Sequence, residues 1–198
     1  MKPLMISPIG EPGSGKSTFS LGLCFALKRA GIQAELVPEV IKHDVFTPEG
    51  VARVVSGKFD SRYLRLQHAA AVGFLQKAEV IVNDGALEPF YFYGKGRVAQ
   101  ERWADYETLL ERFRTEQAGA EHRFVTLALD VGYQATGRHQ DQATAAALRT
   151  PLLDSLWERF GVSPTVLSSE AGIETYTQSL VAEVLERRRP SATRRARP

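Results

Sequence analysis

Gly10-Glu11-Pro12-Gly13-Ser14-Gly15-Lys16-Ser17-Thr18 fits the pattern G-x-x-x-x-G-K-[ST] at every position. This pattern is the phosphate-binding P-loop, which joins a β-strand to an α-helix. Both flanks agree, because Leu4–Ser7 predicts a short buried strand and Phe19–Ala30 predicts a helix with an apolar face. The glycines let successive backbone N–H groups point at phosphate oxygens, and the helix N-terminus adds partial positive charge. The stretch therefore predicts a nucleotide-binding loop.

Two side chains of this loop have separate predicted roles. Lys16 is expected to reach the β- and γ-phosphates, and Ser17 is expected to bind Mg²⁺. The predicted cofactors are thus ATP and Mg²⁺. Pro8 precedes the loop and has no N–H to donate to a neighbouring strand, so the first strand is predicted to end at Ser7.

Strand and helix signals alternate along the rest of the chain. Further strands are predicted at Gln33–Val37, Val80–Asn83, Arg123–Leu129 and Pro164–Leu167, and further helices at Asp60–Ala78, Glu101–Ala118, Gln142–Phe160 and Ile173–Arg188. Such alternation is typical of a parallel α/β sheet. We predict one domain over residues 1–186 with a three-layer P-loop NTPase fold, in which helices cover both faces of a mostly parallel five-stranded sheet.

Composition excludes several classes of protein. No apolar run approaches the about 20 residues that a membrane helix needs, and the N-terminus does not resemble a signal peptide. Cys24 is the only cysteine and is predicted to lie in the core, and one cysteine with four scattered histidines cannot form a structural zinc site. These features predict a cytoplasmic protein without a membrane partner.

Charge is distributed unevenly along the chain. The net charge is +2, but residues 187–198 hold six arginines and no acidic residue, which leaves residues 1–186 with 19 basic and 23 acidic side chains. Residues 187–198 are predicted to form a disordered Arg-rich tail. Such a tail either binds DNA or RNA through phosphate contacts or only keeps the protein in solution.

Two carboxylates are predicted to follow strands at the edge of the sheet that carries the P-loop. Asp84 follows Val80–Asn83, where it can hold Mg²⁺ directly or through water, or can be a simple Asp-Gly turn. Glu39 follows the second strand, where it can act as the base for an acceptor hydroxyl or lie on the surface. We predict Asp84 as a metal ligand and both carboxylates as catalytic residues.

A polar, Gly-bearing loop over residues 130–141 follows the fourth predicted strand. Arg138 lies next to Gly137 in this loop and is the candidate lid arginine, which would stabilise charge on the transferred phosphoryl group; the alternative is a solvated loop residue. Two other segments can contact an acceptor or serve structure alone. They are the aromatic stretch Glu88–Lys95 and the helix that carries Gln67.

From Ile6 to about Leu167 the chain resembles the small P-loop kinases of nucleosides and nucleotides. Val37-Pro38-Glu39 resembles the strand-two carboxylate of deoxynucleoside kinases, where it acts as base. Asp84-Gly85 resembles the Asp-Arg element that follows strand three in many of them, but Gly85 replaces the arginine, so that charge must come from elsewhere. Gly132-Tyr133 through Gly137-Arg138 resembles the lid of the kinase domain that phosphorylates nicotinamide riboside.

The compact domain and the Arg-rich tail are also similar to the phage kinases, relatives of thymidylate kinase, that phosphorylate 5-hydroxymethyluracil within DNA. This resemblance implies host cytoplasm as the location if the protein is phage-encoded. We predict an ATP-dependent kinase that transfers the γ-phosphoryl group to a hydroxyl of a nucleoside-type acceptor, with a 5-hydroxymethylpyrimidine in DNA as the favoured acceptor. The alternatives are a kinase of a free nucleoside or nucleoside monophosphate and a regulatory nucleotide-binding ATPase without an acceptor. The sequence does not give the oligomeric state.

Overall fold

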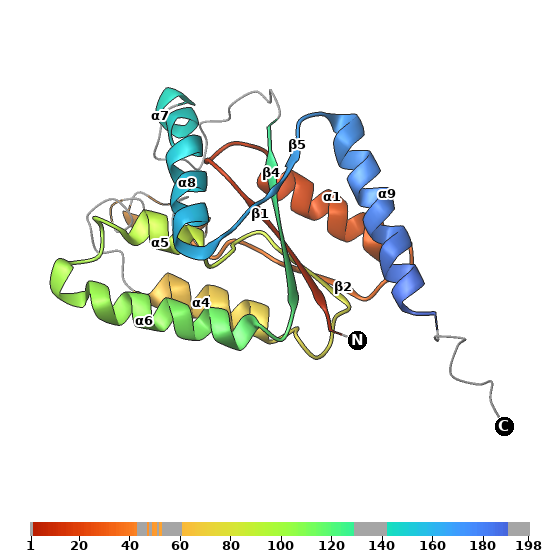
Figure 1. The fold of residues 1–198 in the computed structure, drawn as a ribbon, viewed down its shortest axis with the longest axis horizontal. Helices are drawn as coiled ribbons and strands as arrows, with labels where there is room; N and C mark the ends of the chain where they lie inside the picture. The colour runs from red at the N-terminus through yellow and green to blue at the C-terminus, as the bar shows by residue number, and fades with distance from the viewer. Residues whose placement is uncertain are drawn as a thin grey trace.

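A computed structural model of the chain describes residues 2–42, 47, 49–50, 52, 61–128 and 142–189. The strands are β1 (Leu4–Ile9), β2 (Ala34–Val37), β3 (Val80–Asn83), β4 (Glu121–Leu127) and β5 (Thr165–Leu167). The helices are α1 (Lys16–Arg29), α4 (Ser61–Val72), α5 (Pro89–Gly94), α6 (Gln100–Gln117), α7 (Gln142–Ala147), α8 (Arg149–Phe160) and α9 (Glu170–Arg187). Figure 1 shows these elements as a single layered body.

The five strands form one sheet in the order β2-β3-β1-β4-β5, and every neighbouring pair is parallel. β1 is central, because β3 pairs along one of its edges and β4 along the other. In such a doubly wound sheet the ligand site lies outside the carboxyl ends of the strands, where the chain switches sides. The P-loop leaves β1 at this end of the sheet, toward the top of Figure 1. The predicted P-loop NTPase fold is confirmed.

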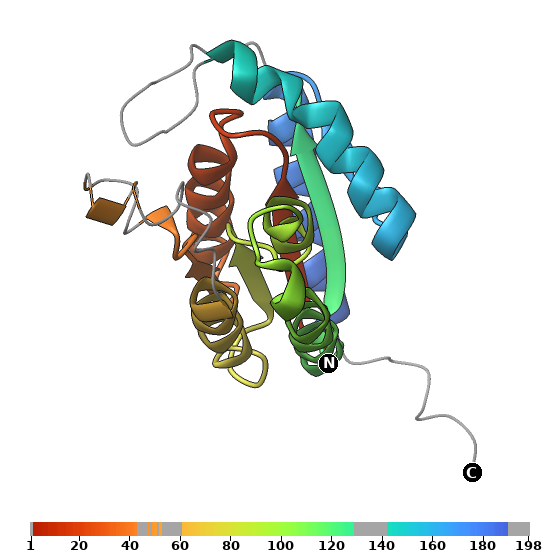
Figure 2. The same cartoon turned by 90° about the vertical axis from the view of Figure 1, so that its left-hand side faces the viewer.

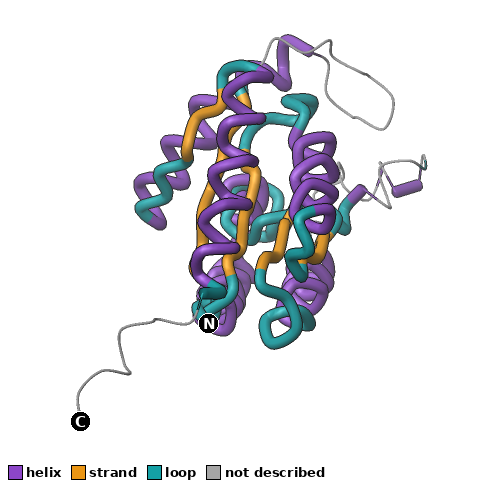
Figure 3. The backbone as a smooth tube through the Cα atoms, turned by 90° about the vertical axis from the view of Figure 1, so that its right-hand side faces the viewer, coloured by secondary structure: helices purple, strands orange, loops and turns teal. Residues whose placement is uncertain are grey.

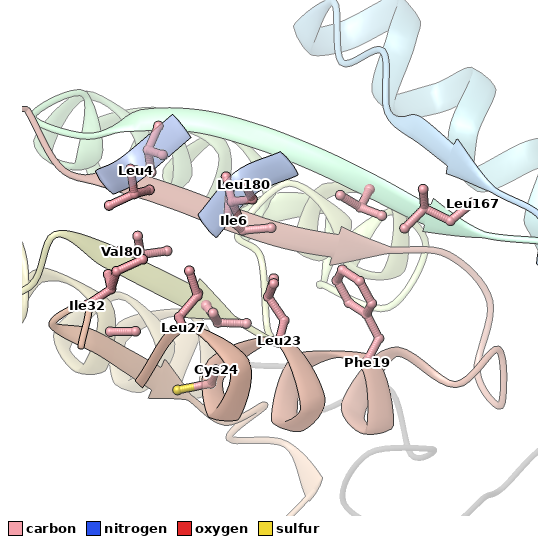
Figure 4. Packing of buried hydrophobic residues seen from close by; sticks show 14 of the residues in the cluster. Leu4, Ile6, Phe19, Leu23, Cys24, Leu27, Ile32, Val80, Leu167 and Leu180 are labelled. Carbon is pink, nitrogen blue, oxygen red and sulfur yellow. The ribbon is translucent and has the colours of Figure 1, made fainter. Parts of the chain in front are cut away.

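One face of the sheet packs against α1 and α9, which lie side by side in Figure 3. Leu4 and Ile6 point to this face, as expected for alternate residues of a strand. The α1 side chains that meet them recur at helical spacing, as Figure 4 shows for Phe19, Leu23 and Leu27. Cys24 belongs to the same buried cluster, so its predicted place in the core is confirmed, and burial raises the pKa of its thiol.

The opposite face packs against α4, α5, α6 and α8 (Figure 2). Met5 and Ile81 point to this face and meet Ala71 of α4. Ile9 meets Leu152 and Leu156 of α8. Because both faces are covered, β1 and β3 are buried and largely apolar, which made them easy to recognise in the sequence, whereas β4 begins with the polar residues Glu121, His122 and Arg123.

Several predicted boundaries were wrong, among them those of β1, α4 and the helix predicted over 142–160. β1 continues through Pro8 to Ile9 and pairs with β4 there, because β3 accompanies β1 only as far as Ile6 and the missing N–H of Pro8 interrupts no β1–β3 pairing. α4 ends at Val72 in a turn, six residues before the predicted end. The helix predicted over 142–160 is divided at Leu148, and Pro151 lies in the first turn of α8, where an N–H has no acceptor within the helix.

The predicted tail also begins too early. α9 includes Arg187, whose guanidinium contacts Glu121 and Glu183, and Arg188 donates hydrogen bonds to Glu79 and to the Gly31 carbonyl. Residues 190–198 lie outside the described residues. None of the described helices combines the length and apolar character needed to cross a membrane.

Candidate active site

Three glycines give the loop after β1 its shape. Gly10, Gly13 and Gly15 have φ angles of 144°, 89° and 88°, in the region that L-residues avoid. A Cβ atom on Gly10 would also lie 3.4 Å from Thr126 Oγ1 of β4. The glycines of the motif therefore lie where the backbone has a positive φ angle, a conformation that other residues adopt only with strain.

The loop ends at the N-terminus of α1. Gly15 is the N-cap and has no side chain to cap the helix, and Phe19 N–H donates to the Gly15 carbonyl at 3.0 Å. The N–H groups of Lys16, Ser17 and Thr18 precede that first bond and have no acceptor within the helix. No acidic residue lies in this first turn, so the helix end is suited to phosphate oxygens.

Lys16 lies across the loop. Its Nζ donates to the carbonyls of Gly10 at 3.1 Å and Glu11 at 2.6 Å. Burial lowers the pKa of Lys16, while the negative charges of Glu39 and Asp84 act in the opposite direction. The ammonium is thus held within the space that the loop encloses, as expected of a phosphate ligand.

Asp84 lies at the carboxyl end of β3 and is 6% exposed. Its Oδ1 accepts a hydrogen bond from Ser20 Oγ of α1 at 3.2 Å, and its backbone N–H donates to the Val37 carbonyl at 2.9 Å. The structure therefore brings this carboxylate to the first turns of the P-loop helix. This is the position that the sequence analysis predicted for a metal ligand.

Lys42 connects both carboxylates to the P-loop. Its Nζ donates to Ser17 Oγ and lies 2.8 Å from Asp84 Oδ2 and 3.2 Å from Glu39 Oε2. Burial alone would lower the pKa of Lys42, but Glu39 and Asp84 outweigh it, so the pKa is raised. The sequence analysis missed this residue. Lys42 lies in the turn that follows β2, where its N–H donates to the Glu39 carbonyl, but its partners Ser17 and Asp84 are distant in sequence.

Gln67 of α4 holds the segment that carries Glu39. The buried amide accepts from Val40 N–H at 2.8 Å and donates to the Pro38 carbonyl at 3.2 Å and to Asn83 Oδ1 at 3.1 Å. These hydrogen bonds join the ends of β2 and β3. The Gln67 amide therefore has a structural role and is not available to bind a phosphoryl acceptor.

Gly85 is explained by the same side chain. A Cβ atom at Gly85 would lie 2.5 Å from the Gln67 amide. An arginine after Asp84 would therefore require the Gln67 amide to move. A positive charge is nevertheless present at Asp84, because the Lys42 ammonium lies 2.8 Å from its Oδ2.

Arg149 reaches the P-loop from the side opposite to Lys42. Its Nε lies 3.3 Å from Glu11 Oε2, and its Nη2 donates to the carbonyl of Leu127 at the end of β4. Arg138, the predicted lid arginine, lies outside the described residues. Arg149 was missed, because its contacts with Glu11 and with the end of β4 depend on how α8 packs against the sheet.

A cavity of about 430 Å³ lies between α5 and α8. Its lining includes Phe92, Tyr93, Lys95 and Arg97 from the α5 side and Pro151 from α8. Burial raises the pKa of Tyr93, and the negative charges of Glu39 and Glu11 add to this effect. Phe90 of the aromatic stretch is a core residue, whereas Phe92 and Tyr93 of the same stretch line the cavity.

The donor set beside the P-loop fits Mg²⁺. Across the described ranges, no group of three or more His, Cys, Asp or Glu side chains could hold a metal ion. Proteins usually bind Mg²⁺ through one or two carboxylates together with substrate phosphates. The Ser17 hydroxyl and the Asp84 carboxylate meet at one ammonium, so they lie close enough to share one cation.

Comparison with known proteins supports the fold. No family model and no curated protein sequence matches the chain. A solved structure of NadR protein in complex with NR has a TM-score of 0.64 and 17% identity, and the match covers 90% of this chain and 51% of that one. A NadR structure in complex with NAD and AMP-PNP has a TM-score of 0.57 and 14% identity, with 92% and 50% covered. The chain thus spans about half the length of these proteins.

Proposed function

We propose that the protein is a kinase that transfers the γ-phosphoryl group of ATP to a hydroxyl of a nucleoside-type acceptor. One observation carries this proposal: the carboxylates of Glu39 and Asp84 converge beside Ser17 of the P-loop. A switch protein needs a nucleotide site and a metal ligand, but it needs no second carboxylate on the acceptor side. The fold shared with NadR protein, which has been solved with AMP-PNP, is consistent with nucleotide binding.

Each residue has a role in this mechanism. Lys16 and the N–H groups at the start of α1 would bind the β- and γ-phosphates, and Ser17 and Asp84 would hold Mg²⁺. When bound, the metal neutralises charge on the phosphate oxygens. Glu39 accepts the proton of the acceptor hydroxyl, whose oxygen forms a bond to the γ-phosphorus. The bond from that phosphorus to the β-phosphate oxygen breaks, and ADP leaves with the electron pair.

The cavity between α5 and α8 is the proposed acceptor pocket. Aromatic side chains such as Phe92 and Tyr93 can stack on a base, and Arg97 and Lys95 can bind a phosphate or a sugar hydroxyl. NadR protein, which shares the fold, has been solved in complex with NR, and this supports a nucleoside-type ligand as the first choice. A 5-hydroxymethylpyrimidine in DNA is the narrower hypothesis, since the tail arginines beyond Arg189 can bind phosphates.

Transfer of radiolabelled γ-phosphate to several acceptors tests the proposal. Free nucleosides, nucleoside monophosphates and hydroxymethylated DNA are compared in parallel, with ATP hydrolysis in their absence as the baseline. We expect label on at least one acceptor at a rate well above that baseline. ATP hydrolysis that no acceptor stimulates or diverts would indicate a regulatory ATPase.

The DNA hypothesis needs a truncation that spares the fold. Removing residues 190–198 leaves the ion pairs of Arg187 and Arg188 intact. If the tail binds DNA, its removal raises the apparent KM for hydroxymethylated DNA, and each lost phosphate contact lowers the log–log salt slope by about 0.9. Equal KM and salt dependence in both forms would exclude a DNA-binding tail.

A further inference from the structure

The Lys42 ammonium contacts oxygens from three separate parts of the fold. It donates to Ser17 Oγ in the first turn of α1, and it lies 2.8 Å from Asp84 Oδ2 after β3 and 3.2 Å from Glu39 Oε2 after β2. Lys16 takes no part in this cluster, because its own Nζ is bound to two P-loop carbonyls. A single protein cation therefore holds the hydroxyl and both carboxylates of the candidate site.

The same oxygens suit a divalent metal. Mg²⁺ binds hydroxyl and carboxylate oxygens at about 2.0–2.1 Å, which is shorter than the ammonium contacts to Asp84 and Glu39. Two cations cannot occupy the centre of one such cluster, because they would repel each other at contact distance. Lys42 and a metal ion bound to Ser17 and Asp84 are thus mutually exclusive.

The Ser17 and Asp84 oxygens are held more firmly than the Lys42 ammonium. Ser17 lies in α1, and Asp84 is 6% exposed and anchored by Ser20 Oγ at 3.2 Å. The Lys42 side chain is 31% exposed and extends from a turn in which its own N–H donates to the Glu39 carbonyl. A lysine stem has four rotatable carbon–carbon bonds, so the ammonium can leave toward solvent while the oxygens stay in place.

We propose that Lys42 is an internal counter-cation that competes with the metal ion for the Ser17 and Asp84 oxygens and leaves when the metal binds. The metal then replaces a cation instead of entering an uncompensated negative site. Departure of Lys42 also frees Glu39, so the proposed acceptor base becomes available only when the metal is in place. This inference rests on the proposed function only in its choice of a divalent cation as the competitor.

Mn²⁺ binding to the protein without nucleotide tests the proposal, with water-proton relaxation as the readout. Lys42→Gln and Lys42→Met should bind Mn²⁺ at least about tenfold more tightly than the wild type. An opposite charge within about 4–6 Å lowers the pKa of a carboxyl by about one to three units, and the same charge opposes the binding of a metal cation. Lys28→Met is the matched control, since it removes a lysine whose exposed partner Glu35 lies outside the site. Adding Asp84→Asn to Lys42→Gln should abolish the gain.

Chemical modification of the wild type supplies a measurement that needs no variant. Mn²⁺ at concentrations that the wild type binds should raise the acylation rate of Lys42, measured by peptide mass spectrometry, and leave the rate of Lys28 unchanged. Unchanged Mn²⁺ affinity in both Lys42 variants, or an acylation rate of Lys42 that Mn²⁺ does not alter, would overturn the inference.

The outcomes separate this inference from the proposed kinase activity. If the wild type transfers phosphoryl groups and the Lys42 variants have unchanged Mn²⁺ affinity, the counter-cation role of Lys42 is refuted and the proposed kinase activity is supported. If those variants bind Mn²⁺ more tightly and the wild type transfers phosphate to no acceptor, the proposed kinase activity is refuted and the counter-cation role of Lys42 is supported.

Discussion

Glu39 is the residue on which the difference between a kinase and a nucleotide-dependent switch depends. If it accepts the proton of the acceptor, Glu39→Gln should lower kcat by about 100-fold or more, within the range for loss of a general base. Affinity for Mg²⁺·AMP-PNP should stay near that of the wild type, because phosphate contacts come from the P-loop. Steady-state kinetics gives kcat, and calorimetry gives the affinity for Mg²⁺·AMP-PNP.

Glu35→Gln is the control for this prediction. It makes the same substitution on β2, at an exposed residue that pairs with Lys28. Loss of nucleotide affinity in Glu39→Gln with an unchanged kcat would assign Glu39 to the nucleotide and not to the acceptor.

Single residues differ in how readily the sequence predicts their contacts. The P-loop is a local pattern of glycines, so its backbone and the place of Lys16 could be predicted from nine consecutive residues. Lys42 was missed because its partners Ser17 and Asp84 are 25 and 42 positions away in the chain, and only the fold brings them together. Its ordinary spacing after Glu39 gave no sign of which charges it would meet.

At the scale of elements, the junction between β2 and β3 depends on Gly85. Gly85→Ala places a Cβ atom 2.5 Å from the Gln67 amide, which holds the Glu39 segment. Such overpacking usually costs about 1–3 kcal/mol of stability. Denaturant unfolding should show a loss of this size.

Gly22→Ala is the matched control, because a Cβ atom there meets nothing within 4 Å in the middle of α1. This substitution should stabilise the protein by up to about 1 kcal/mol, the usual gain from glycine to alanine in a helix. If Gly85→Ala proves as harmless as Gly22→Ala, the junction tolerates movement of Gln67 and does not hold Glu39 rigidly.

Most elements could be predicted because apolar strands and helical spacing are local signals. The exceptions were decided by contacts between residues that are distant in sequence. Pro8 remains in a strand because β3 stops pairing at Ile6, and the short α5 was missed because its aromatic residues suit both a core and a pocket. Leu148 divides the helix predicted over 142–160, although Pro151 was the stronger breaker in sequence.

At the scale of the whole molecule, ion pairs fasten α9 to the sheet. Arg187 and Arg123 hold the pKa of Glu121 down to about 2, against an ordinary value of 4.5. A depressed carboxylate pKa adds stability above pH 4.5, and this contribution is lost as pH falls from 4.5 toward 2. Glu121→Gln should therefore show a flatter dependence of the unfolding free energy on pH across that window.

The measurement is urea unfolding at a series of pH values between 2 and 6. Glu35→Gln again serves as the control, since its partner Lys28 lies on α1 and not on α9. If Glu121→Gln and the wild type lose stability in parallel as the pH falls, the pairs with α9 contribute nothing to the acid sensitivity of the fold. Arg187 and Arg188 were predicted to lie in a disordered tail, because the sequence does not show that α9 brings them to Glu121 and Glu79.

We propose that the loop after β1 binds the phosphates of a nucleotide through Lys16, and calorimetric titration with Mg²⁺·AMP-PNP measures this binding. We predict saturable binding at one site in the wild type and in Lys28→Met. Lys16→Met should bind about 10- to 100-fold more weakly, as expected when a charged hydrogen bond worth about 1.5–3 kcal/mol is lost. A folded wild type that does not bind Mg²⁺·AMP-PNP, or a Lys16→Met variant that binds it as tightly as Lys28→Met, would contradict the claim.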